Sequence, residues 1–277
     1  MLKQRVLTAL VLVGALLAAL AWSPLAFAAL MTLAMAIAQA EWLKLSGWPF
    51  GRALALTLVA GAALFAMLAL RPMWISQAAV PLAVVATAIW LVIGTVLLRS
   101  GHTGGVRLAT PVSGVLAFVL PVAAWCALMV FVQASVVVLV SVLLIVWAAD
   151  TFAYFAGRAF GRRKLAPQIS PGKTWAGVWG GMIGVALLAL AAWVLWPGAP
   201  LFTSRLLDAF GAPAALALLA ALVAISIVGD LFESLLKRQA GAKDSGHLLP
   251  GHGGFYDRID SMLALLPPAA LLWSAAT

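Results

Sequence analysis

Long apolar runs, separated by short polar connections, are the feature that most limits what this chain can fold into. Nine such runs lie at about 6–22, 24–43, 53–70, 78–98, 112–131, 134–156, 175–196, 212–233 and 261–276. Each is close to the roughly 20 residues that a helix needs to cross a bilayer. Because 65% of the 277 residues are hydrophobic and 9% are charged, no sizeable soluble domain is left over. The sequence predicts an all-α, polytopic integral membrane protein with about nine transmembrane helices.

The basic residues indicate how these helices are oriented. If the amino terminus lies in the cytoplasm, fifteen of the 17 Lys and Arg residues fall on that side, and Arg71 and Arg205 fall opposite. This is the positive-inside bias of membrane proteins. Basic loops beside anionic lipid also account for the net charge of +9 without nucleic acid as a partner. The opening stretch imitates a signal peptide, but the apolar run soon resumes, so we interpret Ser23-Pro24 as a turn between two helices.

The acidic residues divide the chain into two regions. Of the 8 Asp and Glu residues, Glu41 alone precedes Asp150, and six of the other seven map to the cytoplasmic side of the second half. We therefore expect an N-terminal membrane region of about five spans over 1–132. A C-terminal catalytic membrane region of about four spans follows over 133–277, with its chemistry in the cytoplasmic loops 157–174 and 234–260.

Carboxylates on two predicted helices are expected to meet in one buried layer. Asp150 in V-W-A-A-D-T-F and Asp230 in I-V-G-D-L-F-E-S lie at similar depths from the cytoplasmic side, and Glu233 follows Asp230 by one helical turn. Ionised carboxylates are costly inside a membrane. Each alone could be the partner of a buried Arg or Lys. Together with Asp257 and Asp260, which share a helix face, they indicate a metal or substrate site.

The first of the two long loops carries groups that bind phosphate. In S-P-G-K-T, Ser170 and Thr174 offer hydroxyls, Gly172 lets the backbone approach a ligand, and Lys173 places a positive charge at a helix start. The spacing of a Walker loop is absent, so the motif is weak by itself.

The second loop mixes acids and bases around the Gly-rich turn P-G-H-G-G. Such a turn presents bare backbone N–H groups, as anion-binding nests do. His252 in this turn could act as a general base, although a packing or backbone-bonding role is equally consistent with its position. The basic residues of the segment are Lys237, Arg238, Lys243 and Arg258.

The run from Ser234 to Asp260 resembles the signature of the phosphatidate cytidylyltransferases, also called CDP-diacylglycerol synthases. The signature has the form S-x-L-K-R-x4-K-D-x-G-x2-L-P-x-H-G-G-F-x-D-R-I-D, and this chain matches it throughout. The segments D-T-F-A-Y-F-A-G-R-A-F-G (150–161) and I-S-P-G-K-T-W (169–175) resemble two further segments of the family, in the same order. One departure is Ala176, where many members carry Glu, so any role of that carboxylate does not transfer.

The resemblance implies that phosphatidic acid and CTP react to give CDP-diacylglycerol and pyrophosphate. It implies Mg2+ as cofactor, held by Asp230 and Asp257, with K+ as a second cation. The catalytic residues would be Asp230, Asp257, Asp260, Lys243 and Arg258. Together with the Gly-rich turn, it implies substrate contacts for Asp150, Ser170, Lys173, Thr174, Lys237, Arg238, His252, Gly253 and Gly254.

The expected setting follows from the resemblance and the charge bias together. We expect a homodimer in the bacterial inner membrane, in contact with membrane lipid, with the amino terminus and active site cytoplasmic and the carboxyl terminus outside. An ion-coupled membrane transporter is the alternative, because buried carboxylates on several helices are also typical of carriers. Against it, the acids gather at one face. The D-G-x-x-A-R string of another membrane transferase class, the CDP-alcohol phosphotransferases, is absent.

Overall fold

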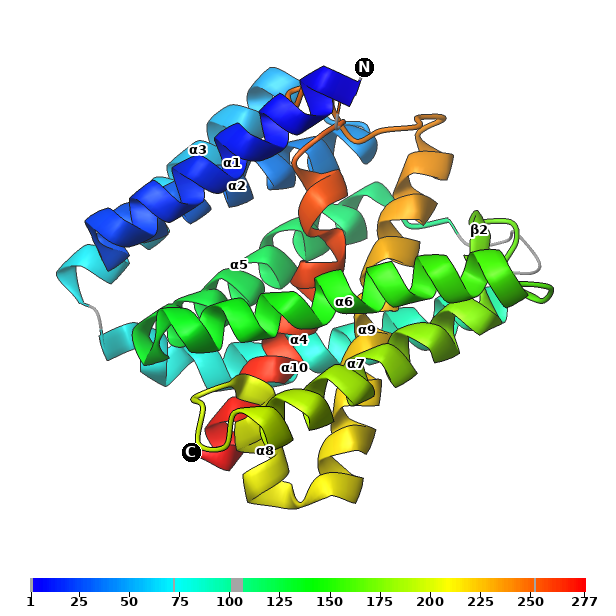
Figure 1. The fold of residues 1–277 in the computed structure, drawn as a ribbon. Helices are drawn as coiled ribbons and strands as arrows, with labels where there is room; N and C mark the ends of the chain where they lie inside the picture. The colour runs from blue at the N-terminus through cyan, green and yellow to red at the C-terminus, as the bar shows by residue number, and fades with distance from the viewer. Residues whose placement is uncertain (1, 72, 101–106, 252) are drawn as a thin grey trace.

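A computed structural model describes residues 2–71, 73–100, 107–251 and 253–277. Within those ranges the chain forms ten helices and one two-stranded hairpin (Figure 1). The helices are α1 (Leu2–Trp22), α2 (Pro24–Leu45), α3 (Phe50–Leu70), α4 (Met73–Ser100), α5 (Thr110–Ala134), α6 (Val136–Phe160), α7 (Trp175–Leu195), α8 (Phe202–Phe210), α9 (Ala212–Gln239) and α10 (Tyr256–Ala276). The hairpin consists of β1 (Lys164–Ala166) and β2 (Ser170–Thr174), which pair antiparallel.

Eight of these helices, α2 to α7 with α9 and α10, are long and apolar enough to cross a membrane. They correspond to eight of the nine predicted spans, and the ninth corresponds to α1, whose described apolar stretch is Leu10–Trp22. The all-α membrane architecture is therefore confirmed. The Ser23-Pro24 turn is confirmed too, because Ser23 caps α2 by accepting a hydrogen bond from the backbone N–H of Ala26 at 3.0 Å.

The structure differs from the sequence prediction in several of the connections between helices. The 157–174 connection contains the β1–β2 hairpin, and the short helix α8 was not predicted. Helix α9 continues to Gln239 instead of ending near 233, because Leu235 and Leu236 still face the core. Helix α10 begins at Tyr256 instead of 261. The irregular part of the second loop is thus confined to 240–255.

Helices α9 and α10 run through the middle of the molecule and are crossed by α4, α5, α6 and α7 (Figure 1). The tight approach of α9 to α10 depends on Gly229, where an added Cβ would meet the backbone carbonyl of Asp260 and, at 2.8 Å, the Cβ of Ala264. Small residues serve the same purpose where α7 packs on α6: a Cβ on Gly181 would lie 3.0 Å from the carbonyl oxygen of Ala149.

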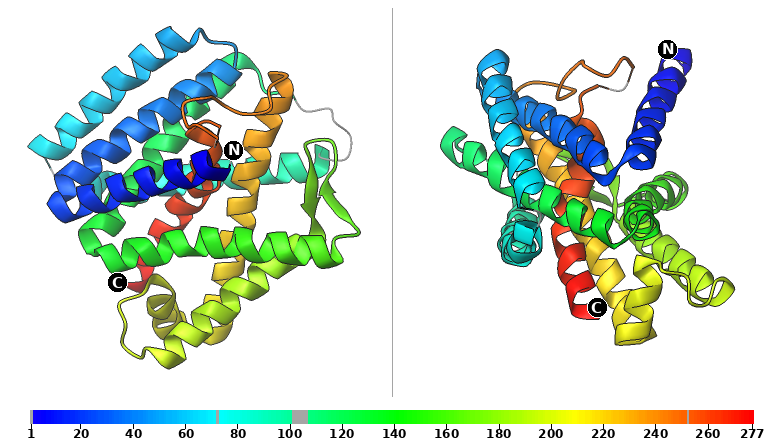
Figure 2. Two further views of the ribbon diagram at one scale, coloured as in Figure 1. Left: turned by 45° about the horizontal axis from the view of Figure 1, so that its top comes forward. Right: turned by 90° about the vertical axis from the view of Figure 1, so that its left-hand side faces the viewer.

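A buried aromatic cluster joins the two halves of the chain. Trp42 of α2 stacks on Tyr256 of α10, with ring centroids 5.2 Å apart, and meets the edge of Phe232 of α9 at 5.1 Å. Trp90 of α4 contacts the same Phe232 at 5.7 Å. Figure 2 shows the end of α2 beside the start of α10, and these two helices contact each other. The N-terminal helices therefore support the segment that resembles the family signature.

Candidate functional site

Three carboxylates gather where α9 and α10 make their closest approach. Asp230, Glu233 and Asp260 each offer an oxygen, and these atoms all lie within 4.8 Å of one another. Asp230 and Glu233 are one turn apart on α9, and Gly229 lets Asp260 approach from α10. Within the described parts of the chain, these three carboxylates are close enough together to hold a metal ion. The sequence predicted that Asp230 would lie close to both Asp257 and Asp260, and of these two Asp260 joins the group.

Lys173 connects the β1–β2 hairpin to the acidic group. Its ammonium lies 2.7 Å from Asp230 Oδ2, and both side chains are partly exposed. These two residues line a cavity of about 480 Å3 together with Asp150 of α6. Thr174 also lines it, but its hydroxyl accepts a hydrogen bond from the backbone N–H of Gly177 at 3.1 Å and so caps α7. Three segments that are far apart in the chain thus place charged groups in one cavity. Helices α6 and α9 each contribute a carboxylate, and β2 contributes the ammonium of Lys173.

Lys237 joins the acidic group to the Gly-rich loop. Its ammonium lies 2.6 Å from the Glu233 carboxylate and 2.7 Å from Asp257 Oδ1. The other oxygen of Asp257 accepts hydrogen bonds from the backbone N–H groups of Ser245 (2.9 Å) and Gly254 (2.8 Å), and from the Ser245 hydroxyl at 2.9 Å. Asp257 therefore holds the loop and Lys237 in place, next to the three-carboxylate group but outside it.

The charge balance at this junction favours a bound cation. Four carboxylates, those of Asp230, Glu233, Asp257 and Asp260, meet the two ammonium groups of Lys173 and Lys237. Like charges so close repel unless a cation or a proton intervenes. Glu233 Oε1 is buried, and no group among the described residues forms a hydrogen bond with it. Oxygen donors of this kind are the ligands that hard cations such as Mg2+ prefer, so the residues present fit a metal ion.

Several other predicted site residues do not belong to this group of carboxylates. Lys243 and Arg258 are exposed, and Gly253 lies on the loop, where its carbonyl accepts a hydrogen bond from Leu249 N–H at 3.0 Å. Ser170 begins β2 and does not line the cavity, although Gly172 and Lys173 of the same strand do. Arg238 faces away from the acids, with its guanidinium 3.3 Å from the carbonyl oxygen of Ile169. His252 lies outside the described residues.

Sequence reasoning missed Glu41, which α2 places beneath the Gly-rich loop. Its side chain is buried, and one oxygen accepts hydrogen bonds from the Ser245 hydroxyl (3.0 Å) and from the backbone N–H of Tyr256 (2.9 Å). Added Cβ atoms on Gly246 and Gly254 would collide with this carboxylate. The available signal was that Glu41 is the lone acid of the first 149 residues, inside a predicted membrane span.

Comparison with known proteins agrees with this picture. Residues 3–275 match the model of the cytidylyltransferase family. A phosphatidate cytidylyltransferase of Pseudomonas aeruginosa is 42% identical over 99% of this chain and 98% of its own length. Proteins of the same name from Haemophilus influenzae and Bacillus subtilis are 50% and 40% identical over 47% and 44% of this chain, and over 43% and 42% of their own lengths.

The fold and site define a helical membrane protein in which carboxylates and lysines meet in one charged group that is suited to a cation. More particularly, the chain belongs to the cytidylyltransferase family. Family membership and the names of these relatives indicate a CTP-dependent nucleotidyltransferase that serves CDP-diacylglycerol synthesis. Nothing in the comparisons supports the alternative of an ion-coupled transporter.

Proposed function

We propose that this protein transfers the cytidylyl group of CTP to phosphatidic acid in the cytoplasmic half of a bacterial inner membrane. A phosphate oxygen of phosphatidic acid attacks the α-phosphorus of CTP. The bond from that phosphorus to the bridging oxygen breaks, and pyrophosphate leaves with the electron pair. The observation that carries the proposal is the contact of Lys173 with Asp230 at the edge of a three-carboxylate group, in one cavity.

The protein's contribution to such a reaction is to hold two polyanions and to neutralise their charge, since no protein nucleophile is needed. Lys173 stands on a β strand and reaches into the cavity, so it can exchange Asp230 for a phosphate oxygen when substrate arrives. Lys237 is held between two carboxylates and keeps a positive charge beside the acids. Arg158 and Lys164, on the exposed wall of the cavity, add positive charge where the phosphates would enter.

We propose Mg2+ as the cofactor, with Asp230, Asp260 and Glu233 as the residues that would hold it. When bound, it would supply positive charge to the reacting phosphates and to the departing pyrophosphate. The assignment of Asp257 as a ligand stays a prediction. For that role Asp257 would have to give up Lys237 or loop hydrogen bonds, because both of its oxygens are engaged. K+ as a second cation also stays a prediction.

The cavity is also suited to a lipid substrate. Besides its charged residues it is lined by Ala153, Val178 and Ile227, from three different helices, and by the exposed Tyr154. An apolar wall beside charged groups matches phosphatidic acid, whose phosphate lies near the membrane surface while its chains stay in the bilayer. We propose that this lipid enters sideways and that CTP enters from the cytoplasm.

The remaining expectations concern the protein's setting. We propose a homodimer with the amino terminus and active site on the cytoplasmic side and the carboxyl terminus outside. The start of α1 and the 240–255 loop lie at one end of the molecule and the carboxyl terminus at the other (Figure 1), which supports this orientation. Thr8 of α1 donates a hydrogen bond to the carbonyl oxygen of Pro250 at 3.0 Å, so both belong to the same end.

A direct assay tests the proposed function. The purified full-length protein in detergent is incubated with phosphatidic acid, CTP labelled in the base and Mg2+, and label is measured in the lipid phase. We expect label that requires phosphatidic acid and disappears with chelator. The matched control is Asp208→Asn, because Asp208 accepts a hydrogen bond from Trp193 Nε1 far from the acidic group and should be dispensable. No label with the folded wild-type protein would reject the proposal.

A further inference from the structure

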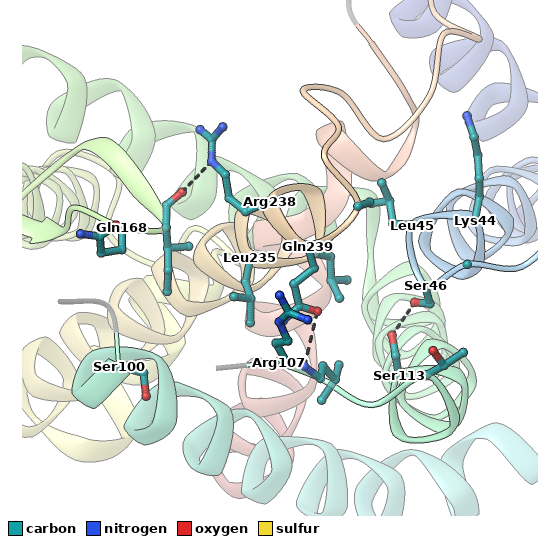
Figure 3. Close-up of a pocket in the computed structure, with 16 residues that line it drawn as sticks. Lys44, Leu45, Ser46, Ser100, Arg107, Ser113, Gln168, Leu235, Arg238 and Gln239 are labelled. Carbon is teal, nitrogen blue, oxygen red and sulfur yellow. Dashed lines mark hydrogen bonds between the residues drawn. The ribbon is translucent and has the colours of Figure 1, made fainter. Parts of the chain in front are cut away.

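A second, larger cavity lies on the opposite face of α9 from the acidic group. It has a volume of about 640 Å3 and is formed by the ends of α2, α4, α5 and α9 together with the turn of the hairpin (Figure 3). Volumes of this size are typical of small-molecule sites. Its lining residues and those of the catalytic cavity do not overlap, and the hairpin lies between the two, with Ile169 facing one and Lys173 the other.

The second cavity is basic. Lys44, Arg107 and Arg238 line it, and none of its described lining residues is Asp or Glu. Arg107 lies at its centre beside Gln239, while Lys44 and Arg238 stand at opposite rims (Figure 3). The part of the lining that the structure describes therefore carries three positive charges and no carboxylate.

Two of the three cations have a further reason for their positions. Lys44 and Arg238 stand in the last turns of α2 and α9, where the helix dipole favours positive charge. That effect does not require a cavity, and it does not apply to Arg107, which precedes α5 and lies in no helix. The convergence of a non-helical Arg with two helix-end cations around an open volume is what points to an anionic ligand.

The rest of the lining places polar groups opposite apolar ones. Ser46 and Ser113 form the polar side, with hydroxyls 2.6 Å apart that also bond to Trp42: Ser46 donates to its carbonyl oxygen at 3.1 Å, and Ser113 accepts from its indole N–H at 3.0 Å. Leu235, Leu236 and Ile169 form an apolar wall on the other. Basic pockets between transmembrane helices on the cytoplasmic side are typical binding sites for anionic lipid headgroups.

We infer that this cavity binds a phosphate-bearing anion, separately from the catalytic centre. The phosphate can belong to the headgroup of an anionic phospholipid or to a soluble phosphate ester, since both offer the same group to Lys44 and Arg107. Helix α9 carries Arg238 on this face and two members of the acidic group, with Lys237, on the other. A ligand bound in the cavity can therefore act on the catalytic side through α9.

The test is a binding measurement that needs no turnover. The full-length protein in detergent is titrated with dioleoyl phosphatidylglycerol, with dioleoyl phosphatidylcholine as the zwitterionic comparison, and with glycerol 3-phosphate as the soluble arm, and bound ligand is counted by native mass spectrometry. The variant is Lys44→Gln with Arg107→Gln. Its matched control is Arg52→Gln, an exposed cation on α3 that does not line the cavity.

We expect phosphatidylglycerol to bind more tightly than phosphatidylcholine, and the double variant to lose at least about tenfold of that affinity. Arg52→Gln should bind as the wild type does, and Arg107→Lys should restore part of the affinity. Selective binding of glycerol 3-phosphate that the double variant loses would support the site with a soluble ligand. Equal binding by the wild type and the folded double variant would overturn the inference.

A kinetic readout separates this site from the substrate site. Lys44 and Arg107 do not line the cavity that contains Lys173 and Asp230, so the double variant should keep its KM for CTP and for phosphatidic acid within about twofold in phosphatidylcholine micelles. A severalfold rise in either KM would show that the cavity is part of the substrate site, and the inference of a separate site would fail. Since binding is read directly, failure of the proposed enzymatic function would leave the binding result interpretable.

Discussion

The hydroxyl of Ser245 lies 3.0 Å from the carboxylate of Glu41, although the two residues are 204 positions apart in the chain. The same hydroxyl lies 2.9 Å from Asp257 Oδ2. A serine hydroxyl has one hydrogen, so it can donate to one of these carboxylates at a time. Glu41 and Asp257 therefore share a single donor, and a helix from the first half of the chain helps to set the geometry of the Gly-rich loop.

Replacement of Glu41 by Ala should loosen the Gly-rich loop. It removes the acceptor for the Ser245 hydroxyl and for the Tyr256 N–H, and an unsatisfied buried group costs about 1–3 kcal/mol. We expect a lower unfolding temperature in detergent and faster protease cleavage within 240–255. Glu41→Gln keeps one acceptor oxygen, so its unfolding temperature and cleavage rate should lie between those of the wild type and of Glu41→Ala. Cleavage of Glu41→Ala at the wild-type rate would contradict this role.

Asp257→Asn should abolish turnover and leave the protein in the membrane fraction. The amide keeps one acceptor oxygen, but its NH2 group faces donors in place of the second oxygen, and the charge that holds Lys237 is lost. We expect kcat to fall by about 100-fold or more, measured as labelled CTP entering the lipid phase. Asp208→Asn serves as control. Unchanged turnover would reject the assignment of Asp257 to the site.

Lys173→Met should separate cation binding from catalysis. Its ammonium now neutralises Asp230 at 2.7 Å, so its removal should leave the acidic group free to bind a divalent cation more tightly. At the same time the phosphates lose a positive partner, and kcat/KM for CTP should fall by about 100-fold. Mn2+ binding followed by electron paramagnetic resonance tests the first effect. Weaker Mn2+ binding would mean that Lys173 does not compete with the cation.

Gly229→Ala should disturb the contact on which the acidic group depends. The new Cβ would meet the carbonyl of Asp260 and the Cβ of Ala264, and overpacking of this kind costs about 1–3 kcal/mol. We expect a lower unfolding temperature together with reduced turnover, since α10 must move away from Asp230. Gly114→Ala on α5 is the control, because nothing lies within 4 Å of its added Cβ. Equal behaviour of the two variants would show that the close approach is unimportant.

The sequence by itself determined that this protein lies in a membrane, and approximately where most of its helices begin and end. Hydropathy and basic charge are properties of local segments, and a bilayer acts on each segment separately. The position of an acid within a predicted span is also a local property. The acids of the second half, Asp230 and Asp260 among them, could therefore be assigned to one site from the sequence. The division of the chain at about residue 132 stays a prediction, as does the set of substrate contacts.

The tertiary structure decided which of these groups meet. Asp260 joins Asp230 and Glu233, while Asp257 is held by Lys237 and the loop. Because Asp257 and Asp260 are three residues apart on one helix, the sequence could not show which of the two joins the group. Glu41 reaches the loop because Trp42 packs on Tyr256. Such contacts join segments far apart in the chain, and they are set by the mutual packing of helices, which no local pattern of residues specifies.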